Sequence, residues 1–163
     1  IVMRYEKDKW QLDLGGEVNF TSLAQQDLLR SNNFDFKQTN YVPRLRARFK
    51  MSKYRSIRIN YSGRTQAPSP WQLQPFQNNN NPLSVIIGNP NLGISYRQSV
   101  SLSYNSHRPI EGGYSYVQVS ANNRINPIGT HRIFDNEGRT TTTYLNLPNA
   151  YGANGYFYMG SKK

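Results

Sequence analysis

Apolar and polar residues alternate over long segments of this sequence, and the alternation constrains the fold more than any other feature. Between residues 10 and 20, for example, Leu12 and Leu14 are each followed by a polar residue or a glycine. A period of two places successive side chains on opposite faces of a β-strand. The sequence therefore predicts roughly seven strands, each with an apolar and a polar face. They cover residues 1–6, 10–20, 41–51, 57–62, 94–105, 114–134 and 140–159.

The lengths of these strands and of their connections narrow the fold class. Most of the strands reach ~10 residues or more, whereas strands of soluble proteins usually have ~5–6 residues. Short turns are predicted at 7–9, 52–55 and 106–113 on one side, and longer connections at 21–40 and 65–93 on the other. Residues 135–138 are predicted to form a tight hairpin tip. Long strands with short turns on one side and long loops on the other are typical of outer-membrane barrels. The predicted fold class is all-β, an antiparallel up-and-down meander that forms a segment of a large transmembrane β-barrel.

The composition excludes several other classes. Only 36% of the 163 residues are hydrophobic and the mean hydropathy is −0.76, which is little for the core of a water-soluble protein. The 12 Tyr, 7 Phe and 12 Gly residues suit strands and turns rather than helices. No apolar run approaches ~18 residues, so we expect no transmembrane helix. The chain opens at Ile1 without a signal segment and has no cysteine for disulfides or thiolate metal sites.

A basic ladder is the strongest chemical feature of the sequence. Lys and Arg outnumber Asp and Glu by 20 to 9, which gives a formal charge of +11. Much of this excess falls on the polar face of two successive strands. The ladder consists of Arg44, Arg46, Arg48, Lys50, Arg58 and Arg64. An Arg or Lys that faced lipid at mid-depth would cost ~2–4 kcal/mol, so we expect the ladder to line the lumen of the barrel.

Aromatic residues near the predicted strand ends form a second group of candidates. Such rings commonly lie at the headgroup level of a membrane, so we expect a girdle, with ordinary packing in a soluble sheet as the alternative. The girdle would comprise Trp10, Tyr41, Tyr61, Tyr104 and Tyr156, with Tyr114 and Tyr158 as further members. Trp71 and Phe76 lie in the proline-rich segment 65–93. Two roles are open for them, contact with a ligand in an extracellular loop and anchoring of that loop to its own barrel.

No catalytic, metal or cofactor site is predicted. His107 and His131 are far apart in sequence, and neither has a Cys, Asp or Glu at metal-ligand spacing. The nine carboxylates form no acid–base pair, and no nucleophile motif or phosphate-binding loop is present. We therefore expect a protein that is not an enzyme and that needs no cofactor.

Several short elements resemble those of TonB-dependent outer-membrane receptors. They are 61–69 (Tyr-Ser-Gly-Arg-Thr-Gln-Ala-Pro-Ser), 73–75 (Leu-Gln-Pro) and 88–92 (Gly-Asn-Pro-Asn-Leu). More closely, the chain resembles the outer-membrane β-barrel family common in Bacteroidota, and this resemblance extends to 4–10 and 154–157. It covers nearly the whole chain. Family members usually continue with Lys-Pro-Glu after the Leu, whereas this chain has Gly93-Ile94-Ser95, so no role is carried over for that Glu.

The resemblance implies a barrel of about 22 strands around an N-terminal plug domain. Such barrels lie in the bacterial outer membrane and import large or scarce ligands. Residues 1–163 would then be a partial barrel domain of about seven strands without its plug, because an open sheet in lipid would leave two unpaired edges. The expected partners are outer-membrane lipid, the rest of the barrel and its plug, an inner-membrane energy-coupling protein and an unknown ligand. Nucleic acid is not expected.

Two questions stay open at this level. The first is the role of the ladder, whose charges would pair with acidic plug residues or steer an anionic ligand. The second is the class of protein, since a soluble β-sandwich that binds carbohydrate or nucleic acid would also show alternation. A sandwich predicts shorter strands and a second sheet packed face to face on the first.

Overall fold

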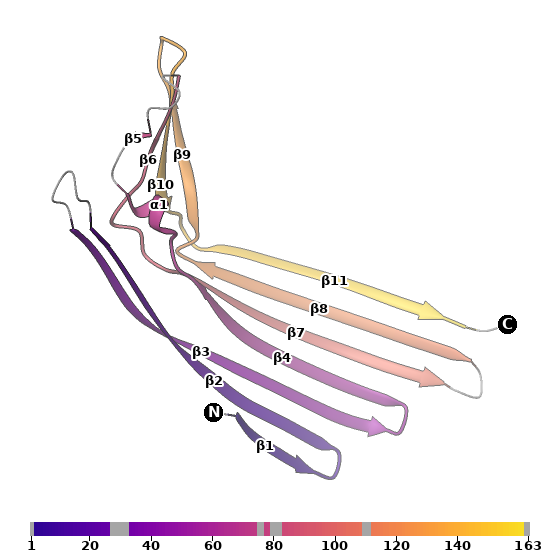
Figure 1. Ribbon diagram of the computed structural model, residues 1–163. Helices are drawn as coiled ribbons and strands as arrows, with labels where there is room; N and C mark the ends of the chain where they lie inside the picture. Colours follow the sequence, from indigo (N-terminus) through magenta and orange to yellow (C-terminus); the bar gives the residue numbers. More distant parts are fainter. Residues whose placement is uncertain (1, 27–32, 75–76, 79–82, 109–111, 162–163) are drawn as a thin grey trace.

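The computed structural model describes residues 2–26, 33–74, 77–78, 83–108 and 112–161, and most of them belong to one large sheet (Figure 1). Its seven strands pair antiparallel with their neighbours in chain order. The strands are β1 (Val2–Lys7), β2 (Trp10–Gln26), β3 (Asn33–Ser52), β4 (Arg55–Gln66), β7 (Ser95–Arg108), β8 (Gly113–Ile125) and β11 (Ala150–Gly160). The predicted all-β antiparallel meander is confirmed for this sheet.

The register of the large sheet confirms the two predicted faces. One row of partners crosses five strands through Leu12, Ala47, Ile59, Leu102 and Val119. The neighbouring positions form a second row through Asp13, Arg46, Asn60, Ser101 and Ser120. Because directly paired residues share a face and successive residues alternate, the first row lies on an apolar face and the second on a polar face.

A small second sheet stands out from the end of the large sheet where the long connections leave it (Figure 1). Its strands, in spatial order, are β5 (Gln77–Asn78), β6 (Ser84–Ile87), β10 (Thr140–Asn146) and β9 (Ile128–Phe134). The pairing of β6 with β10 is parallel, so the meander prediction is wrong for this part of the chain. The small sheet does not cover a face of the large one, and it is therefore not the second layer that a β-sandwich requires.

The predicted strands at 114–134 and 140–159 are each divided between the two sheets. The first breaks at Asn126, which has a positive φ of 50°, and at Pro127, which cannot donate to a strand ladder. The second breaks around Pro148, between β10 and β11. Alternation did not reveal these breaks because the pattern is weak through β9 and β10, so no change of period marks where one sheet ends and the other begins.

The predicted connection at 21–40 is also shorter than expected. Strand β2 continues to Gln26 and β3 begins at Asn33, with unbroken pairing from Gly16 and Pro43 to the two strand ends. Polar residues occupy both faces of this extension, for example Thr21 and Gln38 on one face and Ser22 and Lys37 on the other. Backbone pairing holds such a segment together without an apolar face, so the sequence pattern gave no strand signal there.

The base of the small sheet holds a compact apolar cluster formed by Leu73, Leu92 and Tyr144. Leu73 belongs to the short helix α1 (Pro70–Leu73). Asn89 joins these parts, because its N–H donates to the carbonyl of Gln72 at 2.7 Å and its side-chain amide donates to the carbonyl of Tyr144 at 3.0 Å. The element 88–92 therefore acts as a structural anchor that fastens α1, which follows β4, to the small sheet.

Candidate functional site

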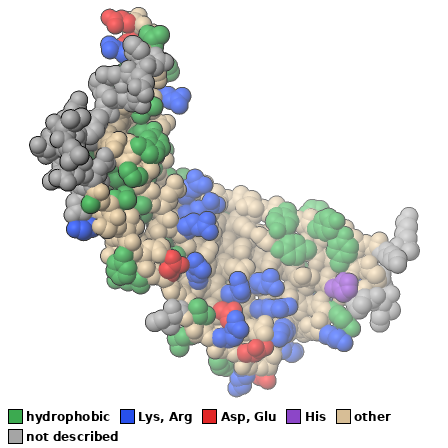
Figure 2. All heavy atoms as spheres, in the orientation of Figure 1, with side chains coloured by type: hydrophobic (Ala, Val, Ile, Leu, Met, Phe, Trp, Pro, Cys, Tyr) green, Lys and Arg blue, Asp and Glu red, His purple; other side chains and the backbone are tan. Residues whose placement is uncertain are grey.

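The basic ladder lies on the polar face of the large sheet. Four of its members alternate along β3, and the register pairs Arg48 with Arg58 and Arg46 with Asn60. Arg64 lies further along β4 on the same face, because it is separated from Arg58 by an even number of residues. The structure thus brings all six predicted ladder residues to one surface. Figure 2 shows Lys and Arg side chains gathered over this part of the molecule.

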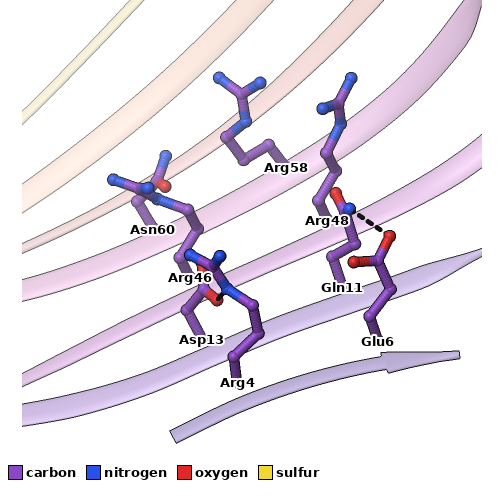
Figure 3. Close-up of a pocket in the computed structure, with 8 residues that line it drawn as sticks. All are labelled: Arg4, Glu6, Gln11, Asp13, Arg46, Arg48, Arg58 and Asn60. Atoms are coloured by element: carbon purple, nitrogen blue, oxygen red, sulfur yellow. Dashed lines mark hydrogen bonds and ion pairs between the residues drawn. The ribbon is translucent and has the colours of Figure 1, made fainter. Parts of the chain in front are cut away.

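The centre of the ladder lines an open groove of about 580 Å³ (Figure 3). Strands β1 to β4 all contribute to its wall. The lining residues are Arg4, Glu6, Gln11, Asp13, Arg46, Arg48, Arg58 and Asn60. Four arginines therefore face two carboxylates, and the groove carries an excess of positive charge that favours an anionic occupant.

Carboxylates from β1 and β2 neutralise part of the basic face. Arg4 Nε lies 2.7 Å from Asp13 Oδ1. Arg44 Nη2 lies 3.1 Å from Glu17 Oε2, and Lys50 Nζ lies 3.4 Å from Glu6 Oε1. These pairs are largely exposed, so each contributes little stability by itself. Their main effect is to cancel charge along the N-terminal side of the ladder.

Three ladder residues in the groove keep their charge uncompensated. Within the described parts of the chain, Arg46, Arg48 and Arg58 form no ion pair. The Nε atom of Arg48 is buried without a hydrogen-bond partner. A buried donor without an acceptor is unfavourable, so the groove offers binding capacity to a carboxylate or another acceptor from outside this sheet.

The register also reveals basic residues that the sequence reasoning missed. Arg64 pairs directly with Arg97, and Arg97 pairs directly with Arg124. Alternation within β7 and β8 marks Arg97 and Arg124 as polar-face residues. Their alignment with Arg64 requires the pairing of three strands, one of which follows a long connection. We call Arg64, Arg97 and Arg124 the arginine row.

The predicted aromatic girdle is divided between the two faces. The apolar face carries Trp10, Tyr41, Tyr61 and Tyr104. Trp10 packs against Phe49 with ring centroids 4.6 Å apart. Tyr156 lies on the polar face instead, where its hydroxyl donates to Gln118 at 3.2 Å. The same face holds Tyr114 and Tyr158, whose rings stack at 5.3 Å. A membrane-facing girdle can therefore include the first four residues but not these three.

The remaining sequence candidates lie at or near the small sheet. Trp71 in α1 presents its ring edge to Tyr144, with centroids 5.2 Å apart, and is still 56% exposed. This contact fits an anchoring role and leaves much of the ring open. Phe76 lies outside the described residues. His107 is in β7 and His131 in β9, and no cluster of metal-ligating side chains occurs in the described part of the chain. None of the described helices is long and apolar enough to span a membrane.

Solved structures with the same fold include a hemophore receptor, a siderophore receptor and a ferric enterobactin receptor. The chain aligns with the hemophore receptor HasR of Serratia marcescens, in complex with its hemophore HasA and heme, over 94% of its own length and 28% of HasR, at 13% identity and a TM-score of 0.66. The siderophore receptor PirA of Pseudomonas aeruginosa aligns with 93% of this chain over 40% of its own length, at 17% identity and a TM-score of 0.60. A mutant of the ferric enterobactin receptor PfeA of the same organism, in complex with enterobactin, aligns with 93% of this chain over 23% of its own length, at 14% identity and a TM-score of 0.62.

At these identities the likeness establishes the fold, and the chain spans 40% or less of the length of each of these receptors. No curated protein matches it in sequence. The model of the outer membrane protein beta-barrel family matches residues 1–162. This chain therefore belongs to the outer membrane protein beta-barrel family, in the bacterial outer membrane.

Proposed function

We propose that this chain is part of the barrel wall of a TonB-dependent receptor that imports a nutrient ligand across the outer membrane. The observation that carries the proposal is the division of one long antiparallel sheet into an apolar face and a continuous polar, basic face. A barrel wall needs these two faces, with lipid on one side and a wet lumen on the other. The fold of the three receptors supports this reading.

The orientation of the sheet follows from the energy of its charges. Ladder residues on the lipid side would each cost ~2–4 kcal/mol at mid-depth, whereas exposed apolar residues such as Leu102 and Val119 are favourable against lipid. The apolar face with Trp10, Tyr41 and Tyr61 is thus the outer surface. The small sheet belongs to the extracellular side, where long connections of such barrels lie.

The whole receptor would contain more than this chain. We propose that residues 1–163 form a partial barrel domain, that further strands close the barrel, and that a plug domain occupies the lumen. The partners would be outer-membrane lipid and an inner-membrane energy-coupling protein. The protein would be a transporter without catalytic activity, of the type common in Bacteroidota.

We further propose that the groove at Arg46, Arg48 and Arg58 receives an acidic surface of the plug. Its unpaired guanidinium groups need acceptors, and the plug is the part of such a receptor that lies against the inner wall. Replacement of Arg44, Arg46 and Arg48 together by Gln should leave the barrel folded and weaken plug retention, measured by urea-induced opening of the intact receptor to ions in a lipid bilayer. If the variant opened at the same urea concentration as the unaltered receptor, the ladder would be a solvated wall that does not hold the plug.

The import function can be tested in a strain that lacks the complete gene. We expect slower uptake of at least one large or scarce nutrient, restoration by the complete gene, and loss of that uptake when a protonophore collapses the inner-membrane proton gradient. A passive pore would continue to conduct its solute without the gradient. Uptake that is lost on deletion but insensitive to the protonophore would therefore contradict energy-coupled import.

The orientation can be tested separately, because the chain has no cysteine. Single cysteines at Ser99 and Ser101 should react with a water-soluble thiol reagent in the intact receptor, and cysteines at Val100 and Leu102 should be spared. The reverse labelling pattern would refute the assignment of the faces.

A further inference from the structure

The arginine row is an unusual arrangement for a β-sheet. Arg64, Arg97 and Arg124 are direct partners on three adjacent strands and point to the same face. Partners of this kind have Cα atoms about 5 Å apart, so the row spans about 10 Å. Like charges directly opposite one another destabilise a sheet. A row of three is therefore unfavourable unless an anion joins it.

The sheet around the row supplies no such anion. The strands β4, β7, β8 and β11 contain no Asp or Glu along their described lengths. Within the parts of the chain that the structure describes, none of the three arginines forms an ion pair or a side-chain hydrogen bond, and all three side chains are exposed. Their donors are free to bind a solute.

The polar row next to the arginine row adds donors. The next polar row toward the short turns consists of Ser62, Ser99 and Asn122, which are again direct partners. Hydroxyl and amide groups of this kind can donate to the oxygens of a carboxylate or a phosphate. Guanidinium groups bind the same oxygens in a two-pronged geometry, which makes arginine the residue of choice for such anions.

The position of the row fits capture of a ligand at the mouth of the barrel. Arg64 lies two residues before the end of β4, Arg97 two residues after the start of β7, and Arg124 one residue before the end of β8. The row thus crosses the large sheet where it meets the small sheet, and Figure 2 shows Lys and Arg side chains gathered at this junction. The long connections lie on this side, so an incoming solute would meet the row before the groove.

We propose that the arginine row is a binding site for a solute with two or more carboxylate or phosphate groups, which names the ligand class of the import function proposed above and rests on it. Three guanidinium groups in a line about 10 Å long present more hydrogen-bond donors than one small anion can contact at once. We therefore expect the bound solute to carry several anionic groups. An acidic plug surface is assigned to the groove, which lies deeper along the same face and has a buried unpartnered donor at Arg48.

Calorimetric titration of the intact receptor in detergent tests this site. The probes are citrate for carboxylates and tripolyphosphate for phosphates, each at low ionic strength. We expect binding of at least one probe, and a loss of affinity of about tenfold or more on replacement of Arg64, Arg97 and Arg124 together by Gln, since hydrogen bonds to charged groups are among the strong ones. The better probe identifies the anionic group.

A matched control removes the same charge from the opposite end of the sheet. Replacement of Lys7, Lys9 and Lys53 by Gln deletes three positive charges at the short turns and should change probe affinity by less than about threefold, the effect of the general field. Equal losses in the two triple variants would overturn the arginine row as a site, as would failure of both probes to bind the unaltered receptor. The single variant Arg97→Gln repeats the test if the triple variant does not fold.

The inference and the import function can fail separately. If the unaltered receptor binds a probe through the row but deletion of the gene impairs no uptake, the import function is wrong and the anion site remains. If deletion impairs energy-coupled uptake but the row variant binds both probes normally, the inference is wrong and the import function remains.

Discussion

The two halves of the polar face hold their positive charge differently. On β1 to β3, the carboxylates Glu6, Asp13 and Glu17 each contact a basic side chain within 3.4 Å, and of the ladder residues on β3 Arg46 and Arg48 form no ion pair with the described residues. Strands β4, β7 and β8 contain basic residues, and no carboxylate occurs in them or in β11. The apolar rows, in contrast, run through both halves without a change. The difference is therefore confined to the face that we assign to the lumen.

This contrast separates two uses of the same residue type. An arginine with a carboxylate partner on the adjacent strand contributes to a neutral wall, because its charge is cancelled inside the sheet. An arginine whose cross-strand partners are other arginines keeps an uncompensated positive charge. That charge favours binding of an anion from outside the sheet. The number of basic residues in the chain does not distinguish the two cases, whereas their partners across the strands do.

The substitutions with the largest expected effect test whether the apolar faces of both halves contact lipid. Leu12 and Leu102 belong to one apolar row and lie in different halves. We expect Leu12→Arg and Leu102→Arg each to lower the free energy of unfolding of the intact receptor by about 2–4 kcal/mol, because each buries a charge in lipid. Urea titration in lipid vesicles would measure this. Ser101→Arg on the polar face is the control and should be nearly neutral; an effect in one half alone would break the comparison.

A second experiment converts the paired half into a basic one. Glu6→Gln, Asp13→Asn and Glu17→Gln together remove the carboxylates without altering the size of the side chains much. We expect the number of tripolyphosphate ions bound per receptor to rise from about one to about two, because the released basic groups attract anions. Calorimetry gives this number directly. An unchanged number would mean that the carboxylates are not what separates the halves.

Single substitutions should change stability in opposite directions in the two halves. Arg97→Gln removes the central member of a like-charged row and should raise the free energy of unfolding by about 0.5 kcal/mol at low salt. Arg44→Gln removes the partner of Glu17 and should lower it by at most about 0.5 kcal/mol. Both differences should shrink at high salt because exposed charges are screened. Equal signs for the two variants would contradict the comparison.

The smallest effect concerns an ion pair outside both halves, at the tip of the β9–β10 hairpin. The guanidinium of Arg139 hydrogen bonds to Asp135 and lowers the pKa of that carboxyl group, with help from the N–H groups of Arg139 and Glu137. A lowered pKa in the folded state stabilises the tip above the ordinary Asp pKa, and this contribution is lost as the pH falls through the folded value. The protection of the Gly138 N–H against hydrogen exchange, relative to an unstructured chain at the same pH, should therefore fall in acid, and Asp135→Asn should remove that dependence on pH.

The sequence alone predicted which face of the large sheet many of its side chains occupy. It did not predict which residues pair across β4 and β7. Alternation placed Leu12, Leu102 and Arg58 on the correct faces, since it depends only on neighbours along one strand. The turn near 53–54 is short enough to set the pairing of β3 with β4. The connection between Gln66 and Ser95 is not, so the alignment of Arg64 with Arg97 could not be predicted.

Other misses have equally local causes. Tyr156 was placed with the girdle because it lies near a strand end, but the break around Pro148 starts β11 in a new phase that turns Tyr156 to the polar face. The parallel pairing of β6 with β10 joins segments more than fifty residues apart, and no local pattern specifies it. Phe76 lies outside the described residues, so its predicted ligand contact remains a prediction.

The base of the β9–β10 hairpin has a consequence for how such proteins diversify. The N–H of Leu147 donates to the carbonyl of Pro127 at 2.8 Å, and the side-chain amide of Asn146 donates to the carbonyls of Gly93 and Asn126. Directly below this clamp, Arg124 pairs with Ala150 and fixes the register of β8 and β11. We therefore expect the hairpin to act as an exchangeable cassette. Its tip should tolerate changes in length or a foreign epitope while the large sheet beneath keeps its pairing, so the outline of the small sheet can evolve independently of the large one.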